Sequence, residues 1–225
     1  MELIEGRPFV DAWLGRPDAR PATGRFLIDT GYDGAVSLNT PFVDAHGILS
    51  GLTASQPTRV GGVGGAAASV VGRLDGFGIG PLRFAAPVAT LSRATSGGSA
   101  SAAYAGLLGG ELFQRLRMTT DYTTNRLVVT CTATCAAPFE ADMSGLALLA
   151  EPDGFRVVGA RTGTPAADAG LALGDLVTHI DGQAAAEVGL MHLRRLLRVS
   201  GAVRVLTVQR GADTRTATLH LRRLI

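Results

Sequence analysis

The chain has 225 residues, of which 46% are hydrophobic and 18% are charged, a composition that excludes a disordered chain and suits one large domain or two small ones. The net charge is +2 and the basic residues are dispersed, so the charge pattern does not indicate a nucleic-acid-binding protein. All 21 basic residues are arginine, which we interpret as the coding bias of a GC-rich bacterial genome. No apolar run approaches the roughly 18 residues that a membrane-spanning helix requires, so no membrane span is expected.

The first two predicted strands lead into an acidic loop. Residues 8–14 and residues 24–30 each predict a strand. The apolar run Phe26–Ile28 continues directly into Asp29-Thr30-Gly31, and a second apolar stretch follows at Ala35–Leu38. This pattern predicts a strand, a tight loop and a strand, with the acid at the tip of the loop. A carboxylate between two apolar strands is unfavourable unless something compensates for it, which makes Asp29 a candidate functional residue.

A glycine-rich segment, Gly61-Gly62-Val63-Gly64-Gly65, follows a short helix predicted at residues 42–46. It stands between two β-prone stretches and predicts a mobile hairpin tip, because glycine adopts unusual backbone dihedrals easily. The spacing Gly62-x-Gly64-x-x-Ala67 also matches a degenerate dinucleotide-binding fingerprint. That fingerprint requires a βαβ context, which does not surround this segment, so a nucleotide site is disfavoured.

A second apolar motif, Gly106-Leu107-Leu108-Gly109, occurs about 75 residues after Gly31. Strands are predicted before it at residues 70–74, 76–79 and 82–91. An amphipathic turn follows the motif and predicts a helix over residues 110–116, and residues 127–130 predict a closing strand.

These three motifs, in this order, resemble those of the aspartic proteases of the retroviral (retropepsin-like) type. The resemblance implies an acid-protease β-barrel domain over residues 1–141. It implies that Asp29 is the catalytic acid, that Thr30 locks the loop through its hydroxyl and that Gly31 keeps the backbone open towards substrate. The segment Gly61–Gly65 would be the flap that closes over a bound peptide. The Gly-Leu-Leu-Gly strand would thread beside the acid loop.

The catalytic chemistry of that family requires two carboxylates that share one proton around a water molecule. The chain contains one Asp-Thr-Gly and no second Asp-Thr-Gly or Asp-Ser-Gly. The resemblance therefore implies a homodimer with twofold symmetry, to which each copy contributes one Asp29.

The composition changes after Pro138, and residues 142–225 carry a different pattern. A strand is predicted at residues 154–158, a short helix at 164–170, a strand at 173–182, a helical stripe at 188–199 and a final hairpin over 203–221. This order, with Gly-Thr-Pro-Ala-Ala-x-Ala-Gly-Leu-x-x-Gly-Asp-Leu-Val, resembles a PDZ domain of bacterial proteases.

The PDZ resemblance implies that peptide C-termini bind by adding a strand to an exposed sheet edge. By that resemblance Gly154, Phe155, Arg156 and Val157 would form the carboxylate-binding loop and the edge strand. Leu190 would line the other side of the groove, and together with Phe155 it would shape the pocket for the last side chain.

Cys131 and Cys135 are close enough in sequence to bridge a turn, and a disulfide would favour an oxidising compartment. Two free thiols in a reducing cell are an equally open alternative. No further His or Cys lies nearby, so neither a metal nor another cofactor is expected. Glu2, Glu5 and Arg7 interrupt the start, so no signal peptide is recognised, and the chain begins either after a removed leader or as a cytosolic protein. The expected location is the periplasm or cell envelope, with the cytoplasm as the alternative.

The expected protein is thus mainly β, with an aspartic endopeptidase domain and a PDZ domain that tethers substrates or regulates activity. A serine hydrolase is the alternative enzyme, but the chain has no Gly-x-Ser-x-Gly elbow and its four histidines have no evident Ser or Cys partner. The alternative outside enzymology is a catalytically silent, dimeric adaptor protein that binds peptides through its PDZ groove.

Overall fold

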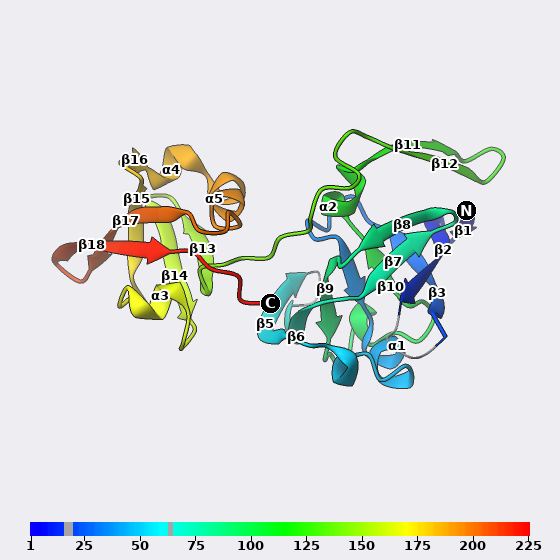
Figure 1. The fold of residues 1–225 in the computed structure, drawn as a ribbon, viewed down its shortest axis with the longest axis horizontal. Helices are drawn as coiled ribbons and strands as arrows, with labels where there is room; N and C mark the ends of the chain where they lie inside the picture. The colour runs from blue at the N-terminus through cyan, green and yellow to red at the C-terminus, as the bar shows by residue number, and fades with distance from the viewer. Residues whose placement is uncertain (16–19, 63–64) are drawn as a thin grey trace. The chain divides into compact units, whose positions relative to one another are not determined.

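The structure is a computed structural model that describes residues 1–15, 20–62 and 65–225. Val63 and Gly64, predicted to lie at the hairpin tip, fall outside the described residues. The described chain is mainly β, as predicted, and divides into two compact units, Met1–Phe139 and Glu140–Leu224 (Figure 1). Each unit has a hydrophobic core of its own. None of the helices in the described ranges is long and apolar enough to cross a membrane.

The N-terminal unit is built almost entirely from short strands. They are β1 (Glu2–Ile4), β2 (Arg7–Gly15), β3 (Ala22–Ile28), β4 (Val36–Leu38), β5 (Ser55–Gly62), β6 (Gly65–Arg73), β7 (Gly76–Ile79), β8 (Leu82–Ala85), β9 (Val88–Ser92), β10 (Gly106–Leu108), β11 (Leu116–Asp121) and β12 (Arg126–Cys131). Its helical segments are α1 (Thr40–Ala45), η1 (Leu49–Gly51), η2 (Gly98–Ala100) and α2 (Gly110–Phe113). Ten strands form one sheet in the order β5-β6-β9-β4-β10-β3-β2-β7-β8, with β1 paired to β2, whereas β11 and β12 form a separate two-stranded sheet.

The short strand β10 is inserted between the two strands that flank the acid loop. Leu107 lies opposite Leu27 in a parallel pairing with β3 and opposite Ser37 in an antiparallel pairing with β4. Gly106 begins the strand where no side chain fits, because a Cβ atom there would lie 1.8 Å from the Ser37 carbonyl oxygen. The prediction that the Gly-Leu-Leu-Gly strand threads beside the acid loop and leads into a helix is therefore confirmed, although α2 ends at Phe113 rather than at residue 116.

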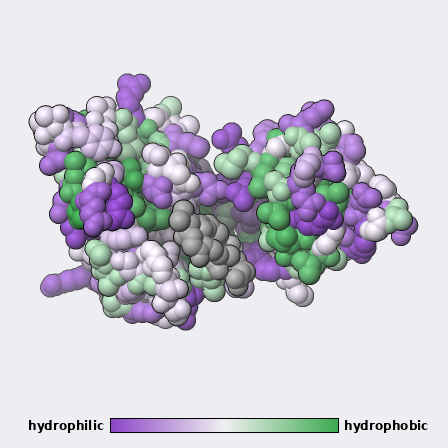
Figure 2. All heavy atoms as spheres, turned by 180° about the vertical axis from the view of Figure 1, so that it is seen from behind, coloured by the Kyte–Doolittle hydropathy of each residue, from purple (hydrophilic) through white to green (hydrophobic). Residues whose placement is uncertain are grey.

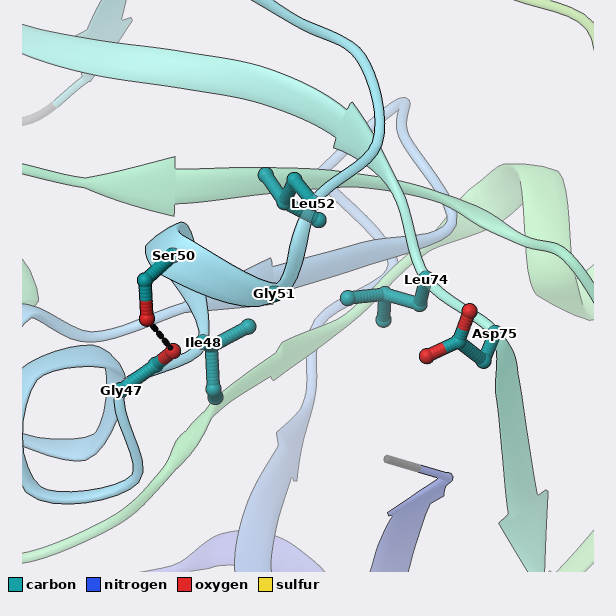
Figure 3. A pocket seen from close by; sticks show the side chains of 7 residues that line it. All are labelled: Gly47, Ile48, Ser50, Gly51, Leu52, Leu74 and Asp75. Atoms are coloured by element: carbon teal, nitrogen blue, oxygen red, sulfur yellow. Dashed lines mark hydrogen bonds between the residues drawn. The ribbon is translucent and has the colours of Figure 1, made fainter. Parts of the chain in front are cut away.

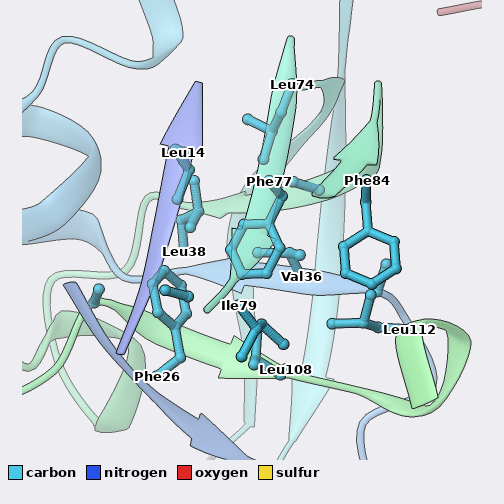
Figure 4. Packing of buried hydrophobic residues seen from close by; sticks show 14 of the residues in the cluster. Leu14, Phe26, Val36, Leu38, Leu74, Phe77, Ile79, Phe84, Leu108 and Leu112 are labelled. Carbon is cyan, nitrogen blue, oxygen red and sulfur yellow. The ribbon is translucent and has the colours of Figure 1, made fainter. Parts of the chain in front are cut away.

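The strands that lead into and out of the acid loop contribute side chains to the core of the N-terminal unit (Figure 4). Phe26, from the strand that leads into the loop, is fully buried and meets Phe77 edge to face, with ring centroids 5.5 Å apart. Leu108 on β10, the neighbour of that strand, and Leu38 on β4, the next strand along, are also fully buried. Burial of each such side chain contributes about 1.5–3 kcal/mol. The three strands around Asp29 are therefore anchored by packing as well as by the backbone ladder.

The C-terminal unit has one six-stranded sheet and three short helices. Its elements are β13 (Leu146–Glu151), β14 (Gly154–Ala160), α3 (Pro165–Asp168), β15 (Leu176–Ile180), β16 (Gln183–Ala184), α4 (Ala185–Val188), α5 (Leu190–Leu196), β17 (Val203–Arg210) and β18 (Asp213–His220). The sheet order is β13-β14-β15-β17-β18, with β16 paired to β15. The predicted helical stripe over residues 188–199 is divided, because Gly189 takes a φ of +72° that ends α4 before α5 begins.

A buried aspartate just before β15 forms ion pairs with the final hairpin, β17–β18. The Asp175 side chain is fully buried and accepts two hydrogen bonds from the Arg210 guanidinium, at 2.6 and 2.8 Å, and one from Arg215 at 3.3 Å. It also accepts the Ala172 backbone N–H at 2.9 Å. These bonds, led by those of Arg210, hold the pKa of Asp175 at about 2, well below its ordinary value.

Because the pKa of Asp175 is depressed in the folded state, its carboxylate stabilises the unit at pH values above the ordinary aspartate pKa. This stabilisation is lost as the pH falls towards about 2. We expect Asp175→Asn to lower the free energy of unfolding of the C-terminal unit by about 2 kcal/mol at neutral pH. Urea unfolding of the full chain between neutral pH and pH of about 2 measures this effect. Asp142, whose pKa is raised by burial, titrates with the opposite sign, so the difference between wild type and Asp175→Asn isolates Asp175.

The matched control is Asp168→Asn, which removes an exposed ion pair with Arg222 and should change the free energy of unfolding by less than about 0.5 kcal/mol. Equal stability of Asp175→Asn and wild type at neutral pH would show that the buried pair is not a stabilising element.

Candidate functional site

The loop that carries Asp29 is tied to β10 at both ends. The Asp29 backbone N–H donates to the Leu108 carbonyl at 2.9 Å, and the Gly109 N–H donates to the Ala35 carbonyl at 3.0 Å. These bonds continue the pairing of β10 with the strands on its two sides. The sheet therefore fixes the position of the Asp29 backbone, where the chain passes from the core to the surface.

The Asp29 carboxylate lies where it can meet solvent. The side chain is partly exposed, and the neighbouring Thr30 and Gly31 are exposed. Asp29 Oδ1 accepts the Gly31 backbone N–H at 2.9 Å, which orients the carboxylate within its own loop. In the described part of the chain the Thr30 hydroxyl has no hydrogen-bond partner. The expected hydrogen bond that would lock the loop through that hydroxyl is therefore not made among the described residues of one copy.

The rest of the loop is clamped against α2. The Gly110 N–H donates to the Tyr32 carbonyl at 2.7 Å, and the Glu111 N–H donates to the Gly34 carbonyl at 3.3 Å. The Tyr32 hydroxyl donates to Thr90 Oγ1 on β9 at 3.1 Å. Two otherwise unsatisfied amides at the start of α2 thus hold the loop in place.

Glycine is required beneath this loop. A Cβ atom on Gly109 would lie 2.4 Å from the Gly34 carbonyl oxygen and 2.5 Å from the Tyr32 ring. A Cβ atom on Gly34 would meet the Tyr32 ring at 2.5 Å or closer. The second glycine of the Gly-Leu-Leu-Gly motif is therefore explained by close approach of the acid loop.

The predicted hairpin is present as β5 and β6. The two strands pair antiparallel over their whole length, with Gly62 opposite Gly65 at the end of the described ladder. The structure thus gives Gly61, Gly62 and Gly65 an extended, paired backbone.

In the C-terminal unit the structure corrects the predicted peptide-binding edge. The strand β14, which contains Gly154, Phe155, Arg156 and Val157, pairs with β13 on one side and with β15 on the other, so it presents no free edge. Phe155 and Val157 are buried in the core of the unit.

The other two residues of that predicted edge, Gly154 and Arg156, have structural roles as well. Arg156 is held by Glu151 at 2.6 Å, and a Cβ atom on Gly154 would lie 2.1 Å from the Val177 carbonyl oxygen. Leu190, by contrast, lies on a helix as predicted, at the start of α5, and it packs partly buried against the core.

The free edge belongs to β13, a strand that was not predicted from the sequence. Among the residues that the structure describes, this strand pairs only with β14 and stands at the end of the sheet. The Met143 N–H donates to the Leu197 carbonyl at 2.9 Å, which joins the segment before β13 to the end of α5. Leu149 on β13 is 57% exposed, and hydrophobic surface is visible on this unit in Figure 2. The sequence signal that would have indicated this strand is the pair of turn residues Pro152-Asp153 between two apolar runs, which is typical of a hairpin such as β13–β14.

Cys131, the last residue of β12, forms a disulfide with Cys135 in the turn that follows. Within the described ranges no group of three or more His, Cys, Asp or Glu side chains is placed to hold a metal ion.

A small surface pocket lies beside α1 in the N-terminal unit (Figure 3). Its lining consists of Gly47, Ile48, Ser50, Gly51, Leu52, Leu74 and Asp75. Ser50 Oγ donates to the Gly47 carbonyl at 2.8 Å, as the dashed line shows. Asp75 is the one titratable side chain of this lining, so the pocket lacks the second group that acid–base chemistry would need.

Comparison with known proteins identifies one part of the chain. Residues 156–210 match the family model of the PDZ domain, which confirms that prediction for the C-terminal unit. No curated protein is similar enough to the chain to count as a match.

The solved structures to which the chain is similar include the following three. For a retropepsin-like aspartic protease from Rickettsia conorii, the identity is 17% over 56% of this chain and 91% of that chain, with a TM-score of 0.38. For a serine endoprotease from Yersinia pestis, it is 10% over 96% of this chain and 94% of that chain, with a TM-score of 0.38. For an aminopeptidase N family protein from Idiomarina loihiensis, it is 22% over 40% of this chain and 15% of that chain, with a TM-score of 0.35. These similarities are distant, and any inference about chemistry depends on the residues of this chain.

Proposed function

We propose that this chain, whose C-terminal unit is a PDZ domain, is an aspartic endopeptidase that acts as a homodimer with one Asp29 carboxylate from each copy. The observation that supports this most directly is the insertion of β10 between β3 and β4. It anchors the Asp29 backbone on Leu108 while the carboxylate itself remains partly exposed. A rigid frame around an accessible acid is what a catalytic carboxylate requires.

The chemistry follows from two such acids placed together. Two carboxylates a few ångströms apart cannot both ionise, so one holds a proton and the other does not. The ionised Asp29 would take a proton from a water molecule between the pair as that water attacks the peptide carbonyl carbon. The protonated Asp29 would donate its proton to the carbonyl oxygen. Collapse of the tetrahedral intermediate, with proton transfer to the amide nitrogen, then breaks the C–N bond and leaves a carboxylic acid and an amine.

A second copy supplies what one copy lacks. The chain has one Asp-Thr-Gly, and the exposed Thr30 hydroxyl has no partner in the described residues of its own copy. A twofold axis beside this loop would bring two Asp29 carboxylates together and would place both Thr30 hydroxyls next to the axis. The β5–β6 hairpins would cover the bound peptide, with Gly61–Gly65 as the flap.

The PDZ domain would bind an extended peptide segment along the free edge of β13 and so tether substrates or regulate cleavage. We further propose a periplasmic or cell-envelope location, which the pairing of Cys131 with Cys135 supports because disulfides persist in oxidising compartments.

The shared site is tested by mixing copies of the chain. We expect wild type to cleave an unstructured protein such as casein and to be dimeric at the working concentration. Addition of an equal amount of Asp29→Asn, with time for subunit exchange, should lower the activity to about half, because random pairing gives half of the wild-type copies an inactive partner. Addition of Asp44→Asn, which changes an exposed residue of α1, should leave the activity undiminished.

Full activity of a strictly monomeric wild type, or unchanged activity when an affinity tag on one copy demonstrates mixed dimers, would contradict the shared site. Absence of cleavage by wild type at any pH from mildly acidic to neutral, combined with peptide binding, would support the adaptor function instead. The PDZ match at residues 156–210 favours that second candidate independently of Asp29.

A further inference from the structure

The segment before β13 contains three consecutive backbone amides whose hydrogen bonds are already made within the chain. The N–H groups of Ser144 and Gly145 both donate to Asp142 Oδ1 at 2.9 Å. The Leu146 N–H donates to Ser144 Oγ at 3.1 Å, and that hydroxyl donates in turn to Asp142 Oδ1 at 2.7 Å. A row of backbone amides leading into an edge strand is the feature that captures a terminal carboxylate in peptide recognition. Here the Asp142 carboxylate occupies it.

Packing holds this arrangement in place. The side chains of Met143 and Ser144 are buried, and Gly145 adopts a φ of +78°. A Cβ atom on Gly145 would lie 2.2 Å from Thr164 Oγ1, so the loop cannot widen towards that side chain. Burial raises the pKa of Asp142, while its hydrogen bonds to Ser144 and Gly145 and the charge of Arg161 oppose that rise. A peptide carboxylate would have to displace Asp142 from these bonds and share the site with a second acid.

The backbone edge beyond this loop is still open. Val157 on β14 donates its N–H to the Asp175 carbonyl and accepts the Gly174 N–H, so its backbone groups point away from β13. Leu148 is opposite Val157 and is therefore a non-hydrogen-bonded position of the β13–β14 ladder, with its own N–H directed to the free edge. By the alternation of the strand, the N–H of Ala150 points the same way.

From these observations we infer that the β13 edge binds an internal, extended segment of a polypeptide rather than a free C-terminus, and that Asp142 sets this specificity by occupying the terminal amides. The inference rests on the proposed peptide-binding function of the PDZ domain. It replaces the expectation that peptide C-termini are the ligand. A peptidase with this edge would hold an unfolded substrate by its middle, wherever the chain end lies.

The test uses the full chain with Asp29→Asn, so that the probe is not cleaved, and matched pairs of short casein peptides that end in either a free carboxylate or a carboxamide. Fluorescence anisotropy gives the Kd of each form. We expect both forms to bind within about twofold of each other, and peptides extended beyond their C-terminus to bind equally well. A free acid that binds at least about tenfold more tightly than its carboxamide would overturn the inference while leaving peptide binding intact.

Variants identify the residues involved. Ala150→Pro removes an N–H from the free edge at an exposed position and should weaken both forms by at least about tenfold, whereas Ala150→Ser keeps the N–H and should bind normally. Asp142→Ala frees the Ser144 and Gly145 amides and should create a preference of at least about tenfold for the free acid. Equal binding of both forms by Asp142→Ala would show that Asp142 does not set the specificity.

A preference for the free acid would overturn this inference alone, whereas two other outcomes also bear on the peptide-binding function on which it rests. Binding of neither form by the Asp29→Asn chain would overturn both. Binding that Ala150→Pro does not affect would place the peptide away from β13, which would overturn this inference and the proposed β13 site while leaving peptide binding intact.

Discussion

Replacement of Asp29 by asparagine is expected to lower kcat/KM for an unstructured protein substrate by at least about 1,000-fold, because asparagine can neither accept nor donate the proton that the reaction transfers. The fold should be unaffected. The one hydrogen bond that the Asp29 side chain makes within the described residues is with the Gly31 N–H, and an asparagine Oδ1 accepts it equally well. Cleavage assays from mildly acidic to neutral pH, with molecular mass and thermal unfolding measured on the same samples, check both parts of the prediction.

The control for charge is Asp44→Asn, which removes one carboxylate from an exposed position of α1. It should keep activity within about twofold of wild type, because surface substitutions of this kind rarely perturb a distant site. If Asp29→Asn retained more than about a tenth of the activity, the catalytic group would lie elsewhere in the chain.

The second large effect is expected from Gly106→Ala. The added Cβ would lie 1.8 Å from the Ser37 carbonyl oxygen and 2.9 Å from its carbonyl carbon, and these are backbone atoms that cannot move without breaking the β4–β10 pairing. We expect the N-terminal unit to lose at least about 4 kcal/mol of stability or to fail to fold, and the peptidase activity to disappear with it. Denaturant unfolding of the full chain should show an unchanged transition for the C-terminal unit.

Gly51→Ala is the matched control. Gly51 ends η1, and a Cβ atom added there would meet no heavy atom of the described residues within 4 Å, so the substitution should change the free energy of unfolding by less than about 0.5 kcal/mol. Wild-type stability of Gly106→Ala would mean that β10 does not pack between β3 and β4 as described.

Local pattern was enough to predict the parts of the candidate active site. The apolar runs on either side of Asp29 determine two strands and a loop, since each side chain alternates into a core that Phe26 and Leu38 fill. The resemblance of the Gly-Leu-Leu-Gly motif to that of retropepsin-like proteases implied that β10 would lie beside that loop, and the register with Leu27 and Ser37 confirms it. Turn residues and short apolar runs likewise predicted β14, β15 and the final hairpin of the C-terminal unit.

Which strand has a free edge was decided only by the tertiary structure. The runs that became β13 and β14 are both short and apolar, and nothing within either one states how many neighbours it will pair with. Phe155 and Val157 proved to be interior because β15 covers the far side of β14, through contacts with residues about 20 positions away in sequence. The binding of Asp142 to the Ser144 and Gly145 amides was equally hidden, because it depends on side-chain geometry in a turn. Sequence by itself therefore determined the elements and the candidate acid, whereas long-range pairing determined which backbone groups remain available to a ligand.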